Sequence, residues 1–198
     1  MTILPVIKTK RLTLRPLSMA DAKDIHHYAT KDEVGPRAGW RPHESLRETR
    51  QFIQNALSKR HRGQPGIFAV VLNATNRVVG TIGVHSFSEG YKGELGMVLT
   101  PELWGQELMV EASEAVMVYA FEMLGLTRLA YKHFPNNSAS ARLREKLGFT
   151  YEGRLRKSFK RFDGQILDEH VASFTDDDYF IRDKARFQAI KKTIDFSL

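Results

Sequence analysis

The chain has 198 residues, of which 42% are apolar and 27% charged, with a net charge of +7 and no cysteine. This length suits one well-buried core and is short for two, and no apolar run approaches the roughly 18 to 20 residues of a membrane helix. Zero cysteines exclude disulfides, a thiol nucleophile and thiolate metal sites, so we expect a cytoplasmic protein. The positive charge favours polyanionic partners such as nucleic acid, acidic lipid or a phosphorylated cofactor.

The first elements carry strand and helix-start signals. The range Ile7–Leu14 alternates apolar residues with basic or hydroxyl residues, which is typical of one half-exposed strand. Ser18 with Asp21 three residues later, and Ser45 with Glu48, form the pattern of a capping box. We therefore expect a helix to begin after each serine.

Hairpins are predicted on both sides of the middle of the chain. Phe68–Leu72 and Val78–Val84 are rich in β-branched residues and flank a polar turn. Later, the dipeptide Asp163-Gly164 separates two alternating runs, which is a strong hairpin signal. From Asp176 onward the tail has a helical pattern, with aspartates near its start that complement the helix dipole.

The central stretch has a strand, turn, helix, strand and helix order. In sequence these are a strand Glu94–Leu99, a turn around Trp104, a helix to Leu124, a strand Thr127–Phe134 and a short helix that ends at Gly148. A strand, helix and strand crossover predicts that the two strands are parallel neighbours. The turn places backbone N–H groups and a helix dipole beside the end of a strand, which suits a phosphate-bearing cofactor.

Several short motifs occur together in this stretch and at the amino terminus. They are Thr9-x-Arg11-Leu12-x-Leu14-Arg15-Pro16, Asp21-Ala22, Glu94-Leu95-Gly96-Met97, Pro101, Trp104-Gly105, Glu111-Ala112, Tyr119-Ala120-Phe121, Pro135-x-Asn137-x-x-Ser140-x-Arg142, Glu145-Lys146-Leu147-Gly148-Phe149 and Glu152-Gly153. Their order and spacing resemble the GNAT-superfamily N-acetyltransferases, and specifically the RimJ/RimL-type branch, over about residues 7 to 175.

The resemblance implies a fold and an activity. The fold would be one α/β domain over residues 1–198, a mixed twisted sheet with helices on both faces and splayed parallel strands at the cofactor site. Residues from about 176 to 198 would form a helical extension. The activity would be acetyl transfer from acetyl-CoA, as co-substrate, to a primary amine by direct attack. The acceptor would be a small-molecule amine or a protein N-terminus, ribosome-associated substrates included, and the chain a monomer or homodimer.

The resemblance also implies a set of cofactor-binding residues. These are Met97, Val98, Leu99, Trp104, Gly105, Gln106, Glu107, Leu108, Met109, Asn137 and Arg142. In the family a bulged strand, here Leu95–Leu99, offers a backbone N–H to the thioester carbonyl, and we expect Val98 to provide it.

Two side chains are candidates for catalysis. Glu94 lies where several superfamily members keep a carboxylate base, although a solvated glutamate at a strand end is the alternative. A lysine ammonium has a reference pKa of about 10.4 and an α-ammonium a reference pKa of about 7.7 to 8.0. The lysine therefore depends more on a base to remove its proton at neutral pH. Ser140 would donate a hydrogen bond to the departing thiolate, and its alternative is a helix residue bonded to backbone.

Glu107 is the main departure from the superfamily pattern, because it stands where a glycine normally lets the backbone approach phosphate. Either its side chain points away, or its charge impairs cofactor binding and the chain is a catalytically impaired GNAT-like binding module. A glycine here, in the first turns of a helix, is expected to lower stability by up to about 1 kcal/mol.

The remaining polar residues carry weaker signals. The seven histidines show no metal-ligand spacing, and we assign no metal. The basic residues between Arg142 and Arg161 keep a nucleic-acid-binding protein open as a lesser alternative, although solvated faces explain them better. The acceptor would be bound by Val34–Pro42 and Phe87–Lys92, with Phe159–Gly164 as a further candidate.

Overall fold

The computed structural model describes residues 4–61 and 64–197, which form a mixed sheet in the order β7-β8-β6-β5-β4-β3-β2-β1-β9. The strands are β1 Val6–Lys8, β2 Leu12–Pro16, β3 Ile67–Leu72, β4 Arg77–Ser88, β5 Lys92–Leu99, β6 Arg128–His133, β7 Thr150–Lys160, β8 Ile166–Thr175 and β9 Asp195–Ser197. The helices are α1 Ala22–Ala29, α2 Leu46–His61, α3 Leu108–Val118, α4 Ser138–Leu147 and α5 Lys184–Lys191. Single 3₁₀ turns lie at Met19–Asp21, Pro36–Ala38 and Pro101–Leu103, and π turns at Tyr119–Met123 and Asp178–Arg182.

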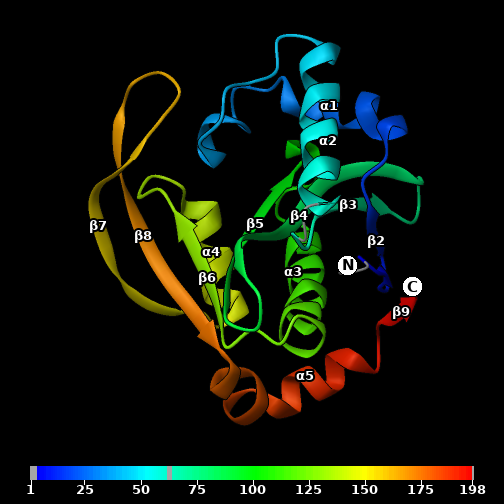
Figure 1. Cartoon of the computed structure of the whole chain (residues 1–198), viewed down its shortest axis with the longest axis vertical. Coiled ribbons are helices and arrows are strands. Elements are labelled where there is room, and N and C mark those ends of the chain that lie inside the picture. Colours follow the sequence, from blue (N-terminus) through cyan, green and yellow to red (C-terminus); the bar gives the residue numbers. More distant parts are fainter. Residues whose placement is uncertain (1–3, 62–63, 198) are drawn as a thin grey trace.

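Helices cover both faces of the sheet, as the resemblance predicted (Figure 1). Strand β3 shows the reason at the level of side chains, because successive residues of a strand point to opposite faces. Phe68 and Val70 pack in the core that contains α3, whereas Ala69 and Val71 pack in the core that contains α1 and α2. A strand buried on both faces is apolar throughout, and this one is.

Strands β5 and β6 are parallel neighbours, as the crossover pattern predicted, but they pair over a short distance. Lys92, Gly93 and Glu94 align with residues 128–130, and the pairing ends there. Beyond this point β5 continues along β4, while β6 continues along β8. The two strands therefore diverge toward their carboxyl ends and leave a gap in the middle of the sheet.

The first predicted strand is in fact two strands. The range Ile7–Leu14 forms the antiparallel pair β1 and β2. A turn separates them because the Thr9 N–H donates to the Leu12 carbonyl at 2.8 Å and the Thr9 hydroxyl accepts from the Leu12 N–H at 3.0 Å. Apolar and polar residues alternate on both sides of the turn, so the pattern does not reveal it.

Both predicted helix starts have the expected serine. Ser18 forms a full capping box with Asp21, whose carboxylate also binds Arg15 at 2.7 Å. At the second start the Glu48 N–H donates to the Ser45 hydroxyl at 3.3 Å, while the Glu48 carboxylate accepts from the backbone of residue 44. Among the described residues, none of the helices has the length and hydropathy to cross a membrane.

The C-terminal segment is helical only in part. It contains α5, as predicted, but it then ends in β9, which pairs with β1 at the edge of the sheet. Phe187 of α5 is 1% exposed, and its ring lies 4.4 Å from that of Tyr179 and 5.7 Å from that of Phe174. This segment therefore contributes to the main core.

Phe187→Ala tests that contribution. Removing a fully buried phenylalanine side chain leaves a cavity, so the free energy of unfolding should fall by roughly 3 to 5 kcal/mol in urea titration. The matched control is Phe180→Ala, because Phe180 belongs to the same segment but is 49% exposed and should change stability far less. Equal losses in the two variants would contradict the packing described here.

Candidate active site

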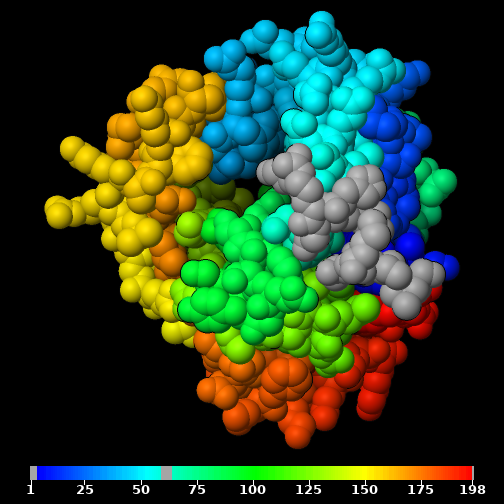
Figure 2. Space-filling model, viewed as in Figure 1, coloured from blue at the N-terminus to red at the C-terminus, as the bar shows by residue number. Residues whose placement is uncertain are grey.

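The gap between β5 and β6 is the centre of a cavity of about 720 Å³. Residues from both faces of the sheet line it, since Met97 and Leu99 pack toward the core of α3 whereas Val98 packs toward the core of α1 and α2. The cavity thus passes through the sheet where the strands splay. In Figure 2 the surface is hollowed between the yellow-to-orange hairpin β7–β8, the blue loop ahead of α2 and the green residues of β4 and β5.

The structure brings most of the predicted site residues together in this cavity. Those that line it are Glu94, Met97, Val98, Leu99, Trp104, Gly105, Glu107, Leu108, Met109, Asn137, Ser140 and Arg142. Gln106 does not line it, and its carbonyl instead accepts a hydrogen bond from the Arg11 guanidinium at 2.8 Å. The roles of these residues remain predictions.

The amino-terminal end of α3 borders the cavity with unsatisfied backbone donors. The first intrahelical hydrogen bond runs from the Glu111 N–H to the Glu107 carbonyl at 3.2 Å, and no side chain caps the helix. The N–H groups of residues 108–110 therefore precede the hydrogen-bonded part of the helix. The Trp104 indole holds the preceding turn by donating to the Leu99 carbonyl at 2.9 Å. Together with the helix dipole, these groups suit an anion.

Glu107 adopts a left-handed backbone conformation, with φ 60° and ψ 12°, immediately before α3. The expectation that position 107 is helical was therefore wrong, and the helix begins one residue later. A glycine at this position has the required conformational freedom, which explains the pattern that Glu107 breaks. Its carboxylate is exposed and pairs with Lys146 of α4, which lowers the pKa of Glu107. The negative charge at the turn is thus compensated by a lysine.

Cationic side chains lie around the same cavity. Arg142 of α4 lines it and forms no ion pair within the described part of the chain. Arg37, from the loop between α1 and α2, places its guanidinium 5.2 Å from the centre of the Trp104 ring, in cation–π geometry. These two arginines make the cavity suitable for a polyphosphate.

Ser140 lies in the first turn of α4, where its N–H donates to the Asn137 side-chain oxygen at 3.1 Å. Its hydroxyl oxygen is 2.8 Å from the hydroxyl of Tyr131 on β6. Burial raises the pKa of Tyr131 to about 12, against the opposing effects of Ser140 and Arg144, so the phenol stays protonated at neutral pH. Sequence reasoning missed Tyr131, although a tyrosine within a buried strand is itself a signal of a polar partner.

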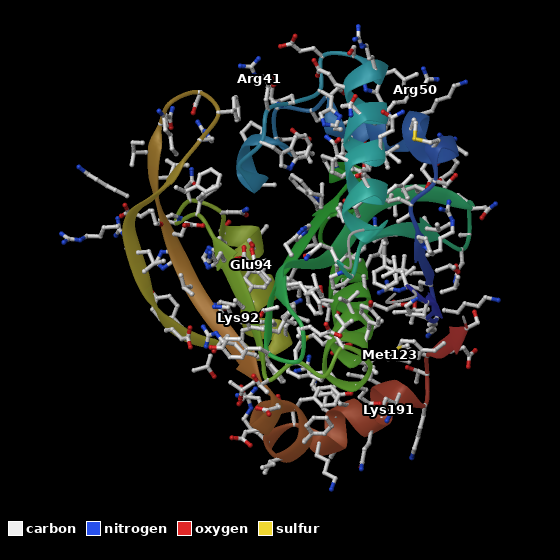
Figure 3. All side chains as sticks on the ribbon, viewed as in Figure 1. Arg41, Arg50, Lys92, Glu94, Met123 and Lys191 are labelled. Atoms are coloured by element: carbon white, nitrogen blue, oxygen red, sulfur yellow. The ribbon has the colours of Figure 1, made fainter. Side chains whose placement is uncertain are left out.

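Glu94 is the last residue of β5 that aligns with β6, and its carboxylate lies 3.1 Å from the Lys132 ammonium. Figure 3 shows Glu94 near the centre of the molecule, between the hairpin β7–β8 and α2. His85 is its cross-strand partner on β4, and the His85 ring covers Gly96, where an added Cβ would lie 2.4 Å from that ring. Glu94 is therefore a paired carboxylate that lines the cavity.

The bulge expected in Leu95–Leu99 is absent. The register between β4 and β5 is continuous from the Gly80 and Leu99 pair to the His85 and Glu94 pair. The irregularity lies instead on β4 beyond His85, where Ser86 has a φ of 46°. The gap thus arises from the divergence of β6. No cluster of metal-ligating side chains occurs among residues 4–61 and 64–197.

Comparisons with known proteins agree on one family. The model of the acetyltransferase (GNAT) domain matches residues 11–150. The uncharacterized N-acetyltransferase p20 of Bacillus licheniformis is 30% identical over 172 residues, which cover 86% of this chain and 96% of the relative. The crystal structure of a GNAT-family acetyltransferase from Bacillus anthracis has a TM-score of 0.76 and 25% identity, and covers 86% of this chain and 98% of its own. The ribosomal-protein-S5-alanine acetyltransferase of Vibrio fischeri shares the fold, with a TM-score of 0.74 and 22% identity over 88% of this chain and 98% of its own.

The left-handed conformation of Glu107 can be tested by comparing Glu107→Gly with Glu107→Ala. Both variants remove the Lys146 ion pair, but only glycine relieves the left-handed strain of about 1 to 2 kcal/mol. The glycine variant should therefore be the more stable by about 1 kcal/mol in urea titration. In an ordinary helical position the order is reversed, because alanine is favoured there by about 1 kcal/mol. A more stable alanine variant would show that position 107 is helical after all.

Proposed function

The chain belongs to the acetyltransferase (GNAT) domain family, and on that premise we propose that it transfers the acetyl group of acetyl-CoA to a primary amine. The observation that supports this best is the divergence of β5 and β6, which joins an anion-binding helix terminus and a paired carboxylate within one cavity. The proposal includes the cytoplasmic location expected from the sequence and either a monomer or a homodimer.

The residues of the cavity fit acetyl-CoA. The N–H groups of residues 108–110 would bind the pyrophosphate, next to Gly105, which has a φ of 78° and open space where a Cβ would lie. Arg142 and Arg37 would neutralise phosphate charge, and Asn137 would contact the pantetheine arm. When bound, acetyl-CoA supplies a thioester whose carbonyl carbon accepts the amine nitrogen and whose sulfur leaves as a thiolate.

The amine nitrogen loses two protons as the ammonium becomes an amide, and the leaving thiolate takes up one. Glu94 is placed to accept the proton of the incoming ammonium, directly or through a water, while Lys132 holds its carboxylate in position. As the new C–N bond forms and the C–S bond breaks, Ser140 is placed to donate a hydrogen bond to the thiolate. The Tyr131 hydroxyl, 2.8 Å from that of Ser140, stays protonated and positions the Ser140 hydroxyl, while the second proton that the nitrogen loses balances the one that the thiolate takes up.

The contacts of the charged residues favour this function over both alternatives. The impaired-module interpretation depended on the side chain and negative charge of Glu107 at a glycine position, but that side chain is exposed and its charge is paired with Lys146. The nucleic-acid interpretation depended on a basic surface, but several of its arginines form ion pairs with acidic neighbours: Arg144 with Glu145, Arg154 with Asp168 and Arg161 with Asp163.

Acetyl-CoA binding is the first test. We expect calorimetry to give a dissociation constant below about 1 mM. This limit corresponds to a binding free energy of about −4 kcal/mol, which several phosphate contacts can readily exceed. The affinity should fall as salt rises, because the cations involved are partly exposed. Absence of heat and of a thermal shift at millimolar acetyl-CoA would contradict the proposal and favour the non-catalytic module.

The second test is Ser140→Ala. If the Ser140 hydroxyl assists the leaving thiolate, kcat should fall by roughly 10²-fold with little change in acetyl-CoA affinity, as expected for a proton-transfer group. Tyr131→Phe should give a smaller loss, because the Ser140 hydroxyl is retained. The control is Ser138→Ala, an exposed serine in the same helical turn that does not line the cavity. Weaker acetyl-CoA binding with an unchanged kcat would make Ser140 structural.

A further inference from the structure

We propose that the acceptor is a small monoamine with an apolar, aromatic-sized body, such as an arylalkylamine. This inference rests on the proposed acetyl transfer and concerns the half of the cavity between the sheet, α1, α2 and the loop at Val34–Pro42, which we call the acceptor pocket. Its walls are formed by Ile25, Tyr28, Val34, Trp40, Phe52 and Val98.

The acceptor pocket is apolar and aromatic. Tyr28 and Val34 are buried, and the rings of Trp40 and Phe52 are linked through His43, at 5.3 Å and 6.1 Å between ring centres. Burial lowers the pKa of His43, with nearby His26 acting in the same direction and Glu48 opposing it, so this imidazole is neutral at pH 7. A wall of this kind gains affinity by removing apolar ligand surface from water, at about 25 cal/mol per Å².

Trp40 is held in place before any ligand arrives. Its backbone N–H donates to the Gly35 carbonyl at 3.0 Å, and its ring covers Gly35 so closely that an added Cβ would lie 2.9 Å from the ring. Gly39, in the left-handed region at φ 88°, turns the chain just before the tryptophan. A wall that is already ordered loses little entropy on binding, so it can select the shape of its ligand.

The loop that carries Trp40 is joined to the hairpin β7–β8. The Phe159 ring lies against Gly39, where an added Cβ would be 2.7 Å from it, and against Phe134 at 5.1 Å between ring centres. Further along the hairpin, Arg41 places its guanidinium 5.9 Å from the centre of the Phe162 ring. Figure 2 shows the orange end of the hairpin meeting the blue loop. This contact fixes the position of the loop beside the cavity, so the shape of the acceptor pocket is set before a ligand binds.

The charges around the acceptor pocket suit one ammonium and not several. The carboxylates that line the cavity on this side are Glu33 and Glu94, and Glu94 is already paired with Lys132. Arg37 lines the same cavity, and so does Arg41, which pairs with Glu44 at 3.8 Å. A second ammonium on the ligand would therefore share the cavity with Arg37, which has no acidic partner among the described residues, and like charges repel. This arrangement disfavours a polyamine.

The experiment is a panel of amines assayed by CoA release with the full chain. The panel contains phenethylamine, tryptamine, spermidine and a short peptide with a free N-terminal alanine, and acetyl-CoA binding is measured in parallel by calorimetry. We expect kcat/KM for the two arylalkylamines to exceed that of spermidine and of the peptide by about tenfold or more, as apolar-pocket selectivity allows.

The variant Trp40→Ala separates the acceptor pocket from the acetyl-CoA site. It should raise KM for the arylalkylamines by about tenfold, the effect of removing a large aromatic contact, while KM for acetyl-CoA stays unchanged. Trp40→Leu serves the same purpose if the alanine variant unfolds at lower temperature. Phe180→Ala is the control, since Phe180 is an exposed aromatic residue that does not line the cavity.

Each result decides between the inference and its alternatives. A higher kcat/KM for the peptide or for spermidine overturns the inference but leaves acetyl transfer in place. A Trp40→Ala variant that changes KM by the same factor for every amine also overturns the inference and leaves acetyl transfer in place. If acetyl-CoA does not bind, both the proposed acetyl transfer and the inference about the acceptor are contradicted.

Discussion

The divergence of β5 and β6 after Glu94 is the constraint on which the site depends. Parallel strands that stayed paired would satisfy one another's backbone groups and close the sheet to any ligand. Here β6 instead follows β8 from position 128 to 133, while β5 follows β4 to Leu99. The separation opens the cavity between the two cores of the molecule. It also places the amino terminus of α3 and the first turn of α4 on the same opening.

Charge compensation shapes the chemistry of this opening. Each of two carboxylates at the cavity has a lysine partner from another element, Glu94 with Lys132 and Glu107 with Lys146. A carboxylate held by a lysine repels a phosphate or a second carboxylate less than an isolated one does. Arg142 and Arg37 have no such acidic partner among the described residues and remain available to an anion. The cavity can therefore accept a polyphosphate despite its glutamates.

The two halves of the cavity differ in what holds them together. The half beside α3 is formed by backbone N–H groups and cationic side chains, which suit the pyrophosphate of a cofactor. The acceptor half is defined by side chains of a loop, and that loop is held through Gly39 and Arg41 against the hairpin β7–β8. Its shape therefore depends on residues far apart in the chain, such as Trp40 and Phe159.

The sequence by itself determined the order of the elements from β5 to α4, the parallel pairing of β5 and β6 and the capping of the helix at Ser18, because these follow from local periodicity and chain connectivity. Its resemblance to the family also placed Trp104, Asn137 and Ser140 at one site. The sequence could not determine contacts between residues that are distant in the chain, or the backbone conformation of a single residue. The left-handed conformation of Glu107 is set by the turn that enters α3.

The tertiary structure alone decided how the site residues are paired. The hydroxyl contact between Ser140 and Tyr131, and the ion pairs of Glu94 and Glu107, join residues on different elements whose separation in the chain carries no signal. The short strand β9 is of the same kind, because three exposed residues form a strand only where β1 offers an unpaired edge. Local preference is too weak to specify such contacts, since each exists only after the sheet has brought distant segments within hydrogen-bonding distance.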